Sequence, residues 1–179
     1  VATTQSWEAI DADVEQLFRA EHRRMSLLLS LAPDLEGDAF AQQLAMAADQ
    51  FIVLPGSRLE ENVIALAEGS ELRTVIAGYH WFGDWGRDTM ISLEGLTLCT
   101  GRYREAGAIL RTFSHYVKDG LLPNLFPEGE RQALYHTVDA TLWYFHALAR
   151  YVQASGDDDI IAQLFPVLDS IVDHYLQGT

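Results

Sequence analysis

The segment that most constrains the fold is 137–154, TVDATLWYFHALARYVQA, because it is apolar on nearly every side of a helix. A helix that is apolar all round is buried all round, so other elements must surround it. Segment 87–99 is a shorter helix of the same enclosed kind, whereas 102–118 and 157–177 carry one apolar stripe each. This alternation predicts two concentric helical layers, as in an α/α toroid or barrel. An α-solenoid of helix pairs is the alternative, although no fixed-length repeat is found.

The rest of the chain is also mainly helical by pattern. Residues 5–31 and 37–50 have apolar residues near helical spacing. Between them and the enclosed helices, FIVLPG and LRTVIAGY predict a short β-hairpin or loop excursion near residues 51–79, because they combine β-branched residues with Gly and Pro. Pro166 is expected to split or kink the last helix, since it lacks a backbone N–H.

Composition narrows the range of partners. The net charge is −14, with 12 basic against 26 acidic residues, which argues against nucleic acid and anionic membranes but suits a neutral ligand such as a sugar. No apolar stretch reaches the roughly 20 residues of a membrane span, and no signal-peptide layout is seen, so a cytoplasmic location is expected. Cys99 is the single cysteine and excludes an internal disulfide; its apolar surroundings, LTLCT, predict a buried structural thiol.

The stretch AGYHWFGDWGRDTM, residues 77–90, is the leading candidate for a site. It sets two Trp, two Asp and one Arg around three Gly, between a predicted strand and a helix, and binding residues concentrate on such loops. Sugar rings have apolar C–H faces and many hydroxyls, so aromatic platforms beside Asp and Arg suit them. An Arg–Asp pair beside Trp can instead be a structural ion pair. The candidates here are Trp81, Asp84, Trp85, Arg87 and Asp88.

Both enclosed helices begin with charged residues. Arg87 and Asp88 open the first, and Asp139 opens the second. If the two helices run in the same direction, these residues meet at one end of the toroid; each Asp can alternatively serve as a helix cap. The loops GLLPNLFPEGE and YHTVDATLW add Asn124 and His136. No HExxH motif, Gly-rich phosphate loop or GxSxG elbow occurs, so we expect neither a metal nor another cofactor.

Four linked segments carry a family resemblance: AGYHWFGDWGRDTMISLEGL, GRYREAGAILRTF, DGLLPNLFP and YHTVDATLWYFHALARY. Together they resemble the glucosidase domain of glycogen debranching enzymes over about residues 48–179. The resemblance implies an (α/α)6 toroid with its active site at one end. It also implies hydrolysis of α-1,6-linked glucose at branch stubs of glycogen or related maltooligosaccharides. Residues 1–36 would lead in from an upstream domain, and 37–179 would be the N-terminal part of the glucosidase domain.

The resemblance also assigns roles to residues. Arg87 and Asp88 would hold the terminal glucose, Trp81 and Trp85 would wall it, and Asp139 would contact it from another side. We count three further residues as substrate-binding candidates. These are Asp84, Asn124 and His136, the last of which stands where the family usually has Asn in YNTVDA.

By the same resemblance, no catalytic residue is expected within the chain. The general acid, in a TWMDA-like loop, and the general base would lie beyond Thr179, about 6.5–9.5 Å apart for an inverting reaction. The remaining part of the glucosidase domain would then be a partner. From chemistry alone, Asp139 could instead be the acid, with Asp88 or Asp84 as its partner. Two other functions stay open: a non-catalytic carbohydrate-binding or scaffold module, and another six-hairpin glucosidase of the glucoamylase or trehalase type.

Overall fold

The computed structural model of the chain describes residues 13–55, 71–78, 83–126 and 133–178, together with Val63, Leu66 and Ala67. It is mainly helical, as predicted, and the short strands β1 and β2 pair in antiparallel fashion within the segment where a hairpin or loop excursion was expected. The elements are α1 (Val14–Ser30), η2 (Pro33–Leu35), α2 (Ala39–Asp49), β1 (Ile52–Val53), β2 (Thr74–Val75), α4 (Gly86–Leu96), η3 (Leu98–Thr100), α5 (Tyr103–Ser114), α6 (Asp139–Ser155) and α7 (Asp159–Gln177).

Local capping explains where several helices begin and end. Asp13 accepts the N–H of Glu15 at the start of α1, and Asp38 accepts two N–H groups at the start of α2. Both satisfy donors that a helix leaves free at its N-terminus. After α4 and η3, Gly101 adopts a left-handed φ of 71°. A Cβ at Gly101 would lie 2.0 Å from the carbonyl oxygen of Leu31, so this glycine also lets the end of α1 approach the helical body.

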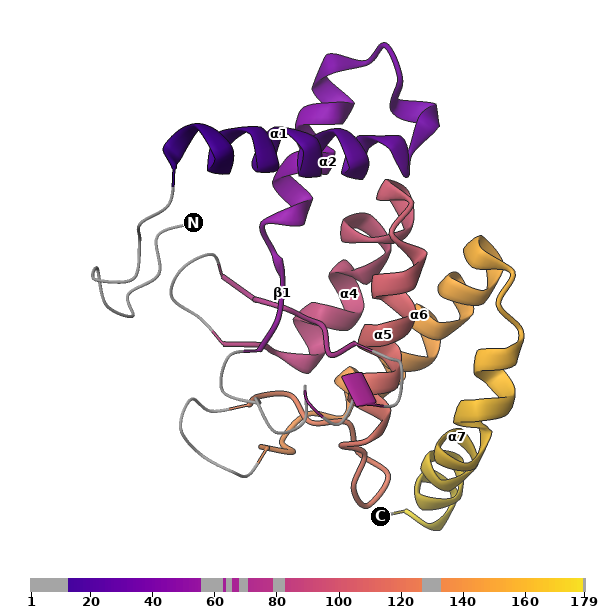
Figure 1. Cartoon of the computed structure of the whole chain (residues 1–179). Helices are drawn as coiled ribbons and strands as arrows, with labels where there is room; N and C mark the ends of the chain where they lie inside the picture. Colours follow the sequence, from indigo (N-terminus) through magenta and orange to yellow (C-terminus); the bar gives the residue numbers. More distant parts are fainter. Residues whose placement is uncertain are drawn as a thin grey trace.

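The helices form two layers. α4 and α6 pack along each other, α5 packs on α6, and α7 packs on α5 (Figure 1). Arg87 at the start of α4 reaches Asp139 at the start of α6, 2.9 Å away. Near the other end, Nε of Arg150 donates to Glu94 at 3.0 Å. The two inner helices therefore run in the same direction, and the arrangement agrees with the predicted partial toroid.

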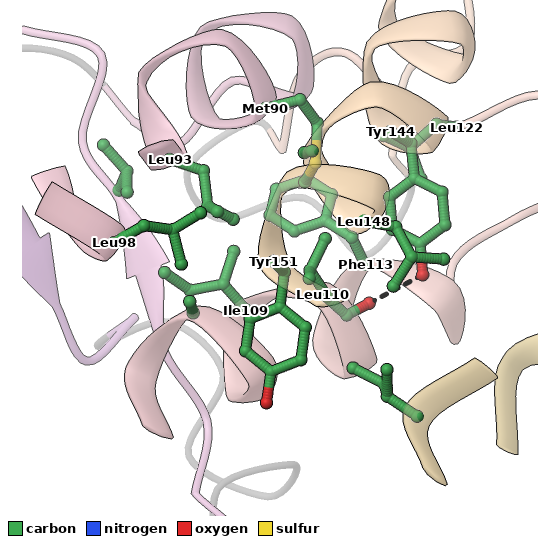
Figure 2. Close-up of a cluster of buried hydrophobic side chains, with 14 of the residues drawn as sticks. Met90, Leu93, Leu98, Ile109, Leu110, Phe113, Leu122, Tyr144, Leu148 and Tyr151 are labelled. Carbon is green, nitrogen blue, oxygen red and sulfur yellow. Dashed lines mark hydrogen bonds between the residues drawn. The ribbon is translucent and has the colours of Figure 1, made fainter. Parts of the chain in front are cut away.

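The core lies between these layers. Figure 2 shows side chains of α4, α5 and α6 interlocking there, and the hydroxyl of Tyr144 donates to the carbonyl oxygen of Leu110 at 3.0 Å. Burial raises the pKa of Tyr144 above its ordinary value, so the phenol stays protonated as a donor. Each large apolar side chain buried here contributes about 1.5–3 kcal/mol. Fully buried members include Met90, Leu93, Ile109, Leu110, Phe113, Tyr144 and Ile160.

Two expectations about burial, for α6 and for Cys99, are wrong, and of the two outcomes expected at Pro166 the split does not occur. α6 is not enclosed: Leu142 is 55% exposed and Trp143 lies beside it at the surface, because α4 and α5 cover only part of the helix. α7 is not split and runs through Pro166, which lies on an exposed face where water can solvate the carbonyl left unpaired. Cys99 is exposed rather than buried. A kink at Pro166 and the domain boundary after residue 36 stay predictions.

The exposed side of α6 continues into α7 as an apolar groove of about 290 Å³. It is lined by Leu142, Phe145, Ile171, Val172, Tyr175 and Leu176.

Candidate functional site

The predicted site is built around the N-terminus of α4, where two distant segments meet. Trp85 forms a β-bridge with Leu125, and Leu125 forms another with Leu134. The N–H of Gly86 donates to the carbonyl oxygen of Asn124 at 3.0 Å, and the N–H of Leu134 donates to Leu125 at 2.9 Å. The GDWGRD turn and the PNLF loop therefore form one small ladder, which fixes where α4 starts.

Gly86 makes this meeting possible. A Cβ at Gly86 would lie 2.0 Å from the carbonyl oxygen of Pro123, closer than real Cβ atoms come to backbone. Glycine is the residue that permits such close backbone approach. Sequence reasoning did not single out Gly86 or Pro123. The sequence does hold one indication of a close backbone contact here: a glycine lies directly between Trp85 and Arg87, both of which are predicted to bind the ligand.

Asn124 lies in the wall of the site. It is 1% exposed, and its Oδ1 accepts the backbone N–H of Arg87 at 3.1 Å. Trp85, the residue at the N-cap position of α4, makes no side-chain cap. Nδ2 of Asn124 lies 3.5 Å from Nε2 of His136, whose side chain is exposed. The N-cap residue of α4 thus provides no hydrogen-bond acceptor, and Asn124, which lies in another loop, provides one instead.

Arg87 and Asp139 meet at the end of the inner helices, as predicted for a parallel pair. Nη1 of Arg87 lies 2.9 Å from Oδ2 of Asp139, and their side chains are 41% and 46% exposed. The hydrogen bond from Arg87 lowers the pKa of Asp139, and Asp139 in turn raises the pKa of Arg87. Asp88 is exposed next to Arg87 and also raises the Arg87 pKa by its charge. Both members of the ion pair remain open to a ligand.

The other candidates take different places. Asp84 is 8% exposed, and its Oδ2 accepts the hydroxyl of Thr74 at 3.1 Å, so it ties the turn to β2. Trp85 is half-buried. Trp81 lies outside the described residues.

A hollow of about 330 Å³ adjoins Asp88, between the β1–β2 pair and α4. This volume falls within the range of small-ligand sites. Apolar walls with a carboxylate at the edge offer both kinds of contact that a sugar ring uses. Its lining residues are Phe51, Val75, Ile76, Ala77, Asp88, Ile91, Ser92 and Leu96.

In the part of the chain that the structure describes, no group of three or more His, Cys, Asp and Glu side chains is placed to hold a metal ion. Among the same residues, no helix combines the length and the hydropathy of a membrane span.

Comparison with known proteins places the chain in a family. Residues 46–179 match the family described as amylo-alpha-1,6-glucosidase. A similar relative is the glycogen debranching enzyme of Saccharomyces cerevisiae, 34% identical over 145 residues. That match covers 74% of this chain and 9% of the yeast protein, so the chain spans a small part of its relative's length. The match of the family to most of the chain, including the ladder and both inner helices, shows that the chain belongs to the amylo-alpha-1,6-glucosidase family.

Proposed function

We propose that the end of α4 and α6 binds the non-reducing terminal glucose of α-1,6 branch stubs in glycogen or related maltooligosaccharides. The observation that carries this proposal is the half-exposed pair of Arg87 and Asp139, which joins two helix starts that are distant in sequence. Oppositely charged side chains that pair while staying about half exposed contribute little to stability, so they are suited to recognition more than to holding a core together. The family membership of the chain supplies the substrate class.

Each residue has a distinct role in this proposal. Arg87 offers several N–H donors in a fixed plane, while the carboxylates of Asp88 and Asp139 accept from sugar hydroxyls. Trp85 and Trp81 cover apolar C–H faces of the ring. Because Arg87 and Asp139 already pair without a ligand, glucose hydroxyls would replace part of their mutual contact.

We infer that this site holds the sugar while carboxylates of the remaining glucosidase domain cleave the bond with inversion. A general acid needs a raised pKa so that it carries a proton at working pH. Arg87 instead lowers the pKa of Asp139, which argues against the alternative that Asp139 is the acid. A cytoplasmic location suits a glycogen substrate and stays a prediction.

Binding of isomaltose to the chain tests this proposal, followed by NMR titration. Replacing Arg87 with Met should weaken binding at least tenfold, since the donors to the hydroxyls are lost. Arg104→Met is the matched control, because Arg104 is 79% exposed at the start of α5, near the other end of α4. Equal affinity in the Arg87 variant and the wild type would refute the proposal.

A hydrolysis assay tests the inferred division of labour. The chain alone should release no glucose from isomaltosyl or maltooligosaccharide substrates. Glucose release that Asp139→Asn abolishes would restore Asp139 as the acid.

A further inference from the structure

We propose that Asn124 is a positioning residue that directs Arg87 toward the sugar by capping α4 and does not itself bind the sugar. The inference rests on the function proposed above and gives Asn124 a different role from the sugar contact predicted for it. It starts from burial: Asn124 is 1% exposed, whereas Arg87, Asp88 and Asp139 are accessible.

One residue satisfies two free donors at the start of α4. The backbone oxygen of Asn124 accepts from Gly86 at 3.0 Å, and its side-chain Oδ1 accepts from Arg87 at 3.1 Å. The first N–H groups of any helix lack partners within the helix. The second bond holds the backbone of the residue whose side chain pairs with Asp139, so the cap acts directly on the arginine that the site uses.

The orientation of the Asn124 amide follows from its neighbours. The backbone N–H of Arg87 can only donate, so the amide oxygen must face it and Nδ2 must point the other way. Nδ2 then lies 3.5 Å from Nε2 of His136. An imidazole nitrogen of the exposed His136 thus lies next to the amide nitrogen of the buried Asn124, and the sugar contact predicted for His136 stays a prediction.

Asn124 is itself held in place, as a positioning residue must be. Its backbone N–H donates to the carbonyl oxygen of Leu134 at 2.9 Å. On its other side, Pro123 packs so closely on Gly86 that a Cβ there would lie 2.0 Å from the Pro123 carbonyl oxygen. A cap fixed on both sides restricts the first turn of α4 to one position.

A double-mutant cycle separates positioning from direct contact. Isomaltose binding is measured by NMR titration for the wild type, Asn124→Ala, Arg87→Met and the double variant, with far-UV circular dichroism confirming the fold of each. Asn124→Ala should weaken binding roughly five- to tenfold, the factor that corresponds to losing one helix cap. In the Arg87→Met background the same change should have no further effect, because there is no arginine left to direct.

Conservative replacements complete the test. Asn124→Asp keeps an acceptor for the Arg87 N–H at a helix N-terminus and should restore binding to within about threefold of the wild type. If Asn124→Ala does not fold, Asn124→Ser replaces it in the cycle with the same expectation. Additive losses in the cycle, or full affinity in a folded Asn124→Ala, would overturn the positioning role. An Arg87→Met variant that binds normally would instead overturn the proposed function.

Discussion

Replacing Gly86 with alanine should force apart the two segments that build the site. The added Cβ would lie 2.0 Å from the carbonyl oxygen of Pro123, and backbone cannot rotate away as a flexible side chain can. Relief requires the PNLF loop to move by about 1 Å or more, since real Cβ contacts essentially never fall under 3.0 Å. That shift stretches two bonds at the start of α4, from Gly86 N at 3.0 Å and from Arg87 N at 3.1 Å.

The expected cost combines strain and lost hydrogen bonds. Overpacking in a closed site costs about 1–3 kcal/mol, and each weakened hydrogen bond about 0.5–1.5 kcal/mol. We therefore expect Gly86→Ala to lower the free energy of unfolding by about 2–6 kcal/mol.

Gly95→Ala is a control in the same helix. Nothing lies within 4 Å of a Cβ built at Gly95, so alanine there should stabilise α4 by about 0.5–1 kcal/mol through its higher helix propensity. Urea unfolding followed by circular dichroism measures both variants. If Gly86→Ala is as stable as the wild type or Gly95→Ala, the account of the ladder as a tight contact is wrong.

Three further predictions concern the rest of the fold. Thr141→Val should lower the free energy of unfolding in urea by about 1–3 kcal/mol, because the Thr141 hydroxyl accepts the buried N–H of Leu122 at 2.8 Å. Thr137→Val should leave stability unchanged or raise it, since the buried hydroxyl oxygen of Thr137 has no partner among the described residues. Equal effects of the two substitutions would contradict this reasoning. Arg102→Ala should cost about 2–4 kcal/mol because the buried Arg102 pairs with both Asp49 of α2 and Glu105, whereas exposed Arg104→Ala should change stability by less than about 0.5 kcal/mol. The apolar groove between α6 and α7 should cause self-association in sedimentation velocity, and Leu142→Glu should reduce it; a monomer at all concentrations would contradict that expectation.

Much of the fold followed from periodicity. The alternation of enclosed and one-sided segments predicted the layering of α4 and α6 against α5 and α7, and Gly101 marked a helix end. The prediction of burial failed for α6, because it depends on which other elements pack against this helix. The sequence of α6 has apolar residues on nearly every side, so every side of the helix can be buried. Whether a side is buried also depends on which elements pack on it, and Leu142 stays exposed.

For the candidate site, too, one part could be predicted from the sequence and another part could not. The charged residues at the starts of the two segments expected to be enclosed predicted that Arg87 and Asp139 meet, because parallel helices bring their N-termini together. Residue type alone could not show that Asn124 is buried and accepts the backbone N–H of Arg87, because a buried cap and a sugar contact both use an amide side chain. This placement depends on the close approach of Gly86 and Pro123, which lie far apart in the sequence.

A crystal structure of the chain with isomaltose or a glucose-like iminosugar bound would show directly whether the sugar binds at the starts of α4 and α6. We expect one sugar ring at these N-termini, with its hydroxyls bonded to Arg87 and Asp88 and an opened contact between Arg87 and Asp139. A sugar bound elsewhere, with the Arg87–Asp139 pair intact at 2.9 Å, would contradict it.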